Sequence, residues 1–234
     1  MKAKLKSERA FTLIELLVAS TIFVTFMVVA GSLVINLLQA QTKANTMRTT
    51  QQSARYIMET IIREARSANG EIDGNGVRWT PSYMFIKADG KFSPYGEITT
   101  ASGVNKDRNG QIVSGFALYQ TSKSEGKVIR KVFWVDSGTG VLKERIDQAA
   151  FQAKGGKISS FTKGEEVALN DPSSDIKITS FILGGSFNSD PLPSNFSPLP
   201  PYLNVGFSAE SSKGAGGRYG ASVTLQSSAT PRNY

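Results

Sequence analysis

The chain has 234 residues and a net charge of +8, from 27 Lys and Arg against 19 Asp and Glu, and 40% of its residues are hydrophobic. This length and composition are those of a folded protein of one or two domains, and they exclude disorder throughout the chain and a collagen-like repeat. The chain has no Cys and no His, which excludes disulfides, thiolate nucleophiles, Ser-His-Asp triads and metal sites built on these residues.

The N-terminal residues 1–10 are basic, and a long apolar run follows them. The charged residues of this stretch are Lys2, Lys4, Lys6, Arg9 and Glu8. The apolar run, residues 11–38, would span about 42 Å as a helix, which exceeds the roughly 30 Å of a bilayer core. It is too long for a secretory signal, and the basic residues before it predict a cytoplasmic N-terminus. We therefore predict a single-pass membrane anchor.

Glu15 is the one charged residue in this apolar run. A carboxylate inside a membrane helix costs about 2.5–3.5 kcal/mol on insertion scales, so such a residue is expected to have a function and a partner. The alternative is that Glu15 lies near the interface and extends its carboxylate into water.

The sequence RAFTLIELLVA at residues 9–19 closely resembles the type III signal of type IV prepilins and type II secretion pseudopilins. The resemblance implies that a prepilin peptidase cleaves between Ala10 and Phe11 and methylates the new amino group of Phe11. This family usually has Gly before the cut, where the present chain has Ala10. We hypothesise that Glu15 pairs with the Phe11 amine of a neighbouring subunit and sets the register of assembly, as a polar residue does in a coiled coil.

The helix is predicted to continue beyond the membrane run, because no proline occurs before Pro81. Apolar residues recur at helical spacing in its second half. They are Ala54, Ile57, Met58, Ile61, Ile62 and Ala65. On the other face, Arg55–Glu59 and Glu59–Arg63 have the spacing of ion pairs. Residues 67–70, SANG, predict the end of a helix over residues 11–68, about 87 Å long. Residues 53–68 also resemble the second helical half of J- and W-type minor pilins.

The sequence after Gly70 is typical of β-structure, with segments rich in Val, Ile, Phe, Tyr and Thr between turn residues. We predict strands at 77–79 with 84–87, 112–120, 128–135, 141–145, 176–183, 202–207 and 221–226, and a hairpin turn at 136–140. The proline-rich residues 186–201 are predicted to form a loop or an extended segment. A long helix followed by strands predicts an α+β fold, the lollipop arrangement of pilins: a long N-terminal helix packed on an antiparallel β-rich head.

Two loops, residues 73–76 and 107–110, faintly resemble calcium loops, but Asp-Gly and Asn-Gly are first of all turn formers, and we predict turns. Arg130 and Lys131 lie on one predicted strand, so their side chains point to opposite faces and form no simple basic patch. A nucleic-acid partner therefore stays a secondary alternative.

We divide the chain into a cytoplasmic leader (1–10), a transmembrane helix half (11–38), an amphipathic helix half (39–68) and a β-rich head (69–234). The resemblance implies a minor pilin or pseudopilin of an initiation or tip complex, without enzyme activity, cofactor or metal. Its expected partners are the prepilin peptidase, other pilin subunits and the inner-membrane assembly platform. It would start in the inner membrane with its head outside and end in an extracellular or periplasmic filament. The alternatives are a tip adhesin or DNA-uptake receptor on the same anchor and, less favoured, an anchored enzyme.

Overall fold

The structure is a computed structural model that describes residues 12–76, 78–93, 98–101, 104–170, 176–186, 202–211 and 220–230. The chain forms two compact units, Met1–Asn45 and Thr46–Tyr234. One long helix crosses the boundary between the units, and all the strands belong to the second unit.

Helix α1 runs from Leu13 to Ser67, 55 residues, which confirms the predicted long N-terminal helix. It ends where the sequence predicted a stop, because the next residues bond to a strand instead of continuing the helix. The backbone N–H groups of Asn69 and Gly70 both donate to the carbonyl of Tyr119, at 3.1 and 3.0 Å. The Asn69 side chain and the Thr121 backbone exchange two further hydrogen bonds, at 2.7 and 3.0 Å. These bonds fix the exit of the chain from the helix.

The described strands pair in antiparallel sheets, which confirms the α+β class. Their bounds are β1 Glu71–Ile72, β2 Arg78–Thr80, β3 Tyr83–Lys87, β4 Ile98–Ala101, β5 Val104–Asp107, β6 Val113–Ser122, β7 Lys127–Asp136, β8 Val141–Ala150, β9 Glu166–Ala168, β10 Ile176–Ser186, β11 Tyr202–Ser211 and β12 Ser222–Ala229. The larger sheets have the orders β3-β6-β7-β8-β9 and β10-β11-β12, and β1-β2 and β4-β5 are two-stranded.

The long strands agree with the prediction in place but exceed it in length. Strand β8 continues to Ala150, five residues beyond the predicted end at 145. The short strands β1, β4, β5 and β9 were not predicted, and Val77 lies outside the described residues. Ser186 closes strand β10, so the predicted loop begins no earlier than residue 187, and residues 187–201 also lie outside the described part.

The predicted hairpin turn at 136–140 joins β7 to β8. The N–H of Gly140 donates to the carbonyl of Asp136 at 2.7 Å, and Gly140 has a φ of +69°. Only glycine adopts this left-handed conformation readily, so Gly140 is required by the geometry of the turn.

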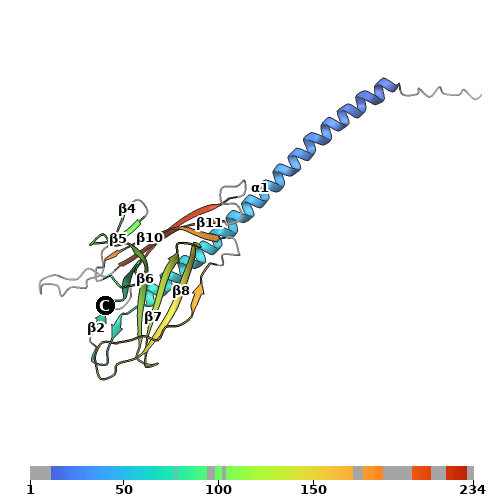
Figure 1. Ribbon diagram of the computed structural model, residues 1–234. Coiled ribbons are helices and arrows are strands. Elements are labelled where there is room, and N and C mark those ends of the chain that lie inside the picture. Colours follow the sequence, from blue (N-terminus) through green and yellow to red (C-terminus); the bar gives the residue numbers. More distant parts are fainter. Residues whose placement is uncertain are drawn as a thin grey trace, which may run out of the picture. The chain divides into compact units, whose positions relative to one another are not determined.

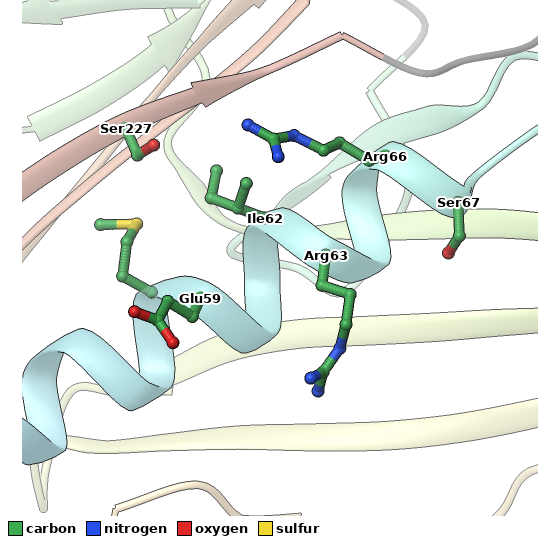
Figure 2. A pocket seen from close by; sticks show the side chains of 7 residues that line it. Glu59, Ile62, Arg63, Arg66, Ser67 and Ser227 are labelled. Atoms are coloured by element: carbon green, nitrogen blue, oxygen red, sulfur yellow. The ribbon is translucent and has the colours of Figure 1, made fainter.

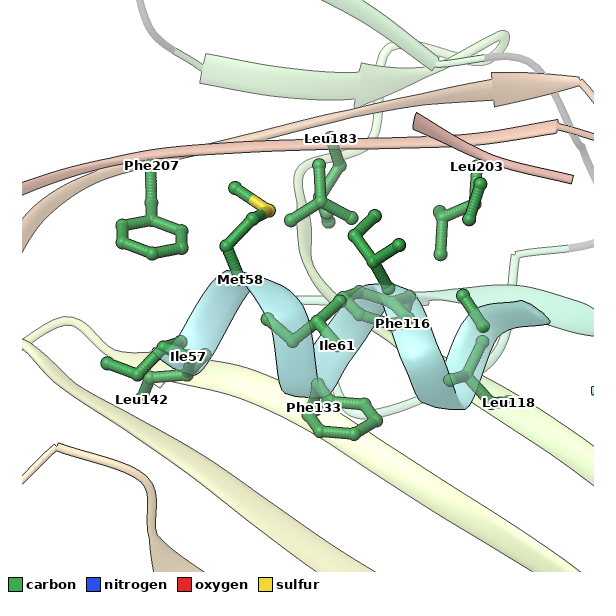
Figure 3. Packing of buried hydrophobic residues seen from close by; sticks show 14 of the residues in the cluster. Ile57, Met58, Ile61, Phe116, Leu118, Phe133, Leu142, Leu183, Leu203 and Phe207 are labelled. Carbon is green, nitrogen blue, oxygen red and sulfur yellow. The ribbon is translucent and has the colours of Figure 1, made fainter. Parts of the chain in front are cut away.

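The second half of α1 lies between the two larger sheets of the second unit (Figures 1 and 3). Figure 3 shows Ile57, Met58 and Ile61 between Phe116, Phe133 and Leu142 of the five-stranded sheet and Leu183, Leu203 and Phe207 of the three-stranded sheet. These residues belong to one core cluster in which each is at most 7% exposed. The predicted apolar stripe of α1 is therefore confirmed, and it is buried on two sides because a sheet covers each.

The predicted ion pairs along the exposed face of α1 are wrong. Neither Arg55–Glu59 nor Glu59–Arg63 is among the salt bridges of the described residues. Exposed pairs gain little in water and lose side-chain entropy, so correct spacing alone does not make them form.

Candidate functional site

The N-terminal end of α1 is a capping box built by Thr12 and Glu15. Oε2 of Glu15 accepts hydrogen bonds from the backbone N–H and from the hydroxyl of Thr12, each at 2.9 Å. In return, the Thr12 Oγ1 accepts from the N–H of Glu15 at 3.3 Å. This reciprocal pattern satisfies N–H groups at the helix start that have no partner inside the helix.

The first unit exposes an apolar surface along α1. The large hydrophobic side chains between Leu13 and Leu38 are 52–83% exposed. The helix is long and apolar enough to cross a membrane, with a mean hydropathy of 2.4 in its most apolar window. A contiguous apolar surface of this extent marks a site of contact with lipid or with other proteins.

The hydroxyl side chains in this segment bond to the backbone of their own helix. The bonds run from Ser20 and Thr21 to the Leu17 carbonyl, from Thr25 to Thr21 and from Ser32 to Val29, with lengths of 2.8–2.9 Å. Polar groups in lipid need partners inside the protein, and these bonds supply them. The Ser and Thr residues are therefore compatible with a membrane-spanning segment.

Of the predicted site residues, Ala10 and Phe11 lie outside the described part of the chain. Glu15 lies in the first turn of α1, where Thr12 is its partner within the chain. Thr12 was not among the predicted site residues, although Thr-x-x-Glu before an apolar run is the recognised signature of a capping box. The pairing of Glu15 with the amine of a neighbouring subunit stays a prediction.

The two acidic loops are turns, as predicted. Asp107 is 3% exposed, and its carboxylate accepts from the N–H groups of Asn109 and Gln111 and from the hydroxyl of Ser93, at 2.9–3.0 Å. The carboxylate of Asp73 accepts from the N–H groups of Asn75 and Gly156, at 2.9 and 3.1 Å. Both carboxylates thus hold loop backbone in place.

Arg130 and Lys131 point to opposite faces of the five-stranded sheet, and each forms a salt bridge with an acidic side chain. Lys131 Nζ lies 2.6 Å from Glu64 Oε2 of α1. On the other face, Nε and Nη2 of Arg130 donate to Oδ2 of Asp147, at 3.0 and 2.7 Å. The structure therefore does not bring the two residues into a basic surface patch.

Asp147 is fully buried between two arginines. Arg145 Nε donates to Asp147 Oδ1 at 2.8 Å, opposite Arg130. Burial raises the pKa of Asp147, but hydrogen bonds and charge from both arginines outweigh burial and hold it below its usual range. The Arg130 guanidinium also lies 4.3 Å from the ring centroid of Phe161. Burial raises the pKa of the adjacent Tyr119 to about 12. Arg130, Arg145, Asp147, Phe161 and Tyr119 thus form a cluster that stabilises one face of the five-stranded sheet.

Residues 5–31 match the family model described as the prokaryotic N-terminal methylation motif. No curated protein and no solved structure matches the chain. The matched residues include Glu15 and most of the exposed apolar half of α1. The N-terminus of this chain is therefore a type IV pilin-like signal, with a prepilin methylation motif on a helix suited to anchoring in a membrane.

Proposed function

We propose that this chain is the precursor of a minor pilin or pseudopilin subunit. It is inserted in the inner membrane with its N-terminus in the cytoplasm, and it assembles through α1 into a type IV pilus or a type II secretion pseudopilus. The observation that carries the proposal is the coincidence of the methylation motif at residues 5–31 with a helix whose apolar side chains are exposed. The segments would be the leader (1–10), the membrane half (11–38), the amphipathic half (39–68) and the head (69–234).

The first step is hydrolysis of the peptide bond between Ala10 and Phe11 by a prepilin peptidase, which then methylates the Phe11 amine. Ala10 is small, like the Gly usual in the family. Thr12 supports this cleavage site, because it caps α1. The mature chain would then begin at Phe11, one residue before Thr12, which caps the helix.

Mass spectrometry tests this step directly. The terminal peptide of the chain, isolated from cells that contain the peptidase, should begin at Phe11 and carry one methyl group. In cells without the peptidase, the leader should remain. A chain that keeps residues 1–10 when the peptidase is present and active on its other substrates would overturn the proposal.

The second step is assembly, in which Glu15 receives the Phe11 amine of a neighbouring subunit. The geometry of the capping box supports this role, because both bonds from Thr12 end on Oε2. No donor among the described residues reaches the other oxygen of Glu15. The carboxylate can therefore cap its own helix and still accept an amine from a second chain, which places the two helices in a defined register.

The third element is the head, which we place in an initiation or tip complex, in contact with other subunits and with the assembly platform. The resemblance of residues 53–68 to J- and W-type minor pilins supports this position, as does the size of the head, which is awkward to repeat along a filament. Quantitative mass spectrometry of sheared filaments should find a few copies for each filament. A copy number equal to that of the most abundant subunit would contradict a minor role.

A further inference from the structure

A groove with a volume of about 480 Å³ lies between the second half of α1 and strand β12 (Figure 2). It is separate from the apolar half of α1 on which the proposed assembly depends. Its lining residues are Met58, Glu59, Ile62, Arg63, Arg66, Ser67 and Ser227. Met58 and Ile62, each 7% exposed, form an apolar floor.

The groove exists because the side chains of β12 become small towards its end. Side chains alternate along the strand, so Leu225, Ser227 and Ala229 share one face. Leu225 packs against the core cluster and Ala229 belongs to it. Ser227, between them, lines the groove. A small hydroxyl at this position leaves open the space that a larger side chain would fill.

Two arginines line the groove. Figure 2 shows Arg66 extending over Ile62 towards Ser227, whereas Arg63 points away from β12. Both side chains are exposed, and neither forms a salt bridge within the described part of the chain. Glu59 is the one acidic residue in the lining. The groove therefore carries a net positive charge over an apolar floor.

Strand β12 is also the edge of its sheet, since among the described strands it pairs with β11 alone. Every second residue of an edge strand directs its N–H and C=O groups outward, where an extended peptide can add as a further strand. The groove thus offers three kinds of contact side by side: charge, apolar surface and backbone.

We infer that this groove docks an extended acidic segment of another protein. A carboxylate of the segment would bind Arg66, which extends towards Ser227 of β12, and Arg63 would add positive charge on the side of the groove away from β12. One apolar side chain of the segment would cover Met58 and Ile62, and its backbone would pair with β12. Bidentate binding of carboxylates suits arginine. The apolar floor and the strand edge favour a peptide over DNA, whose phosphates would leave both unused.

The inference is tested by peptide binding to the full chain in zwitterionic detergent. The probe is a fluorescent, capped peptide of about eight residues that alternates Val and Thr and carries two central Asp, a composition that favours an added strand. The matched control peptide has Asn in place of Asp. We expect the Asp peptide to bind at least tenfold more tightly, with affinity decreasing as salt increases.

Variants of the chain locate the binding surface. R63A/R66A should lose binding of the Asp peptide, whereas Arg55→Ala, an exposed arginine of α1 outside the groove, should keep it. The charge swap R63E/R66E should lose the Asp peptide and bind the same peptide with Lys in place of Asp, which a misfolded variant would not do. An N-methylated Asp peptide, unable to pair along one edge, should bind at least tenfold more weakly.

The inference is overturned if the Asp and Asn peptides bind equally or not at all, or if R63E/R66E fails to exchange its preference. It is also overturned if duplex DNA binds through Arg63 and Arg66 while the Asp peptide does not. None of these results depends on cleavage at Ala10, so failure here and failure of the proposed function are distinguishable.

Discussion

Lys131 Nζ lies 2.6 Å from Oε2 of Glu64, and this ion pair joins the middle of the five-stranded sheet to α1. Both side chains are about one-fifth exposed, at 19% and 20%. The pair is therefore shielded from water more than a surface salt bridge, and it attaches the helix on the side of the core where Phe133 also packs.

We predict that Lys131→Ala lowers the free energy of unfolding by about 1–3 kcal/mol, because Glu64 loses a charged hydrogen bond where water does not fully replace it. The measurement is urea denaturation of the full chain in detergent. Lys127→Ala is the matched control, since Lys127 begins the same strand and is exposed. A double-mutant cycle with Glu64→Gln should show coupling, and additive effects of the two changes would contradict the prediction.

Glu144 makes the stability of the head depend on pH. Burial raises the pKa of Glu144 above its usual value, with Lys131 opposing the shift and Glu64 adding to it. Because the folded state prefers the protonated form of Glu144, this preference stabilises the fold fully at a pH below the pKa of Glu144 in the unfolded chain. This stabilisation is lost as the pH increases through the raised pKa of the folded chain.

Glu144→Gln isolates this effect. Wild type and variant should be equally stable at about pH 3–4. The wild type should become the less stable of the two as the pH increases to about 7. Urea midpoints measured at several pH values give the difference. Glu125→Gln, in the exposed turn between β6 and β7, is the control. A difference that does not change with pH, or that favours the wild type at high pH, would contradict the prediction.

Two roles of Glu15, capping and charge, can be separated by substitution. Glu15→Gln keeps an acceptor at the third helical position but removes the charge, whereas Thr12→Ala weakens the cap, by about 1 kcal/mol in typical helices, and keeps the charge. If the charge sets the register, Glu15→Gln and Glu15→Val should enter filaments poorly and Thr12→Ala should enter them normally.

The readout is the amount of each variant in sheared filaments, with removal of residues 1–10 measured in the same cells. Thr12→Ser, which keeps the hydroxyl, is the control. Normal incorporation of Glu15→Val would contradict the role of the charge. Equal defects in Thr12→Ala and Glu15→Gln would assign the effect to the start of the helix instead.

Gly140 and Gly126 form a matched pair of turn glycines, with φ values of +69° and +64°. A Cβ at Gly126 would meet no atom within 4 Å, whereas a Cβ at Gly140 would lie 2.9 Å from the carbonyl oxygen of Ile178 and would contact Lys177. Gly126→Ala should cost about 1–2 kcal/mol from its backbone conformation alone. Gly140→Ala should cost about 1–3 kcal/mol more, from overpacking against β10. Thermal denaturation compares the two variants, and equal costs would contradict this account.

The local features of the chain were predictable from sequence, because their causes lie within a few residues. The apolar run, the stripe from Ala54 to Ala65 and the turn that ends at Gly140 each depend on spacing or on one conformational requirement. The methylation motif at residues 5–31 is of the same kind. Thr12 was readable in the same way, since its partner Glu15 is three residues away.

The features that were missed depend on residues far apart in the sequence. Strand β8 extends beyond its predicted end at 145 and includes Asp147, a residue type with low β propensity. In the fold, Arg130, 17 positions before Asp147, neutralises its charge. Strand β5 was missed because a four-residue strand that contains Asn105 and Asp107 has little β propensity. The side chain of Asn105 bonds to the backbone of Phe181 and Leu183 in β10, at 2.7 and 2.9 Å, and no local pattern reveals such contacts.

The position of α1 between two sheets also determines how the head responds to mechanical load. A force along the helix axis would act in shear on contacts with both sheets at once, through Ile57, Ile61 and the Lys131–Glu64 ion pair. Such contacts must fail together, whereas a helix lying on one open face could be peeled away one turn at a time. A pull on the second half of α1 would therefore be shared between the two sheets that enclose it.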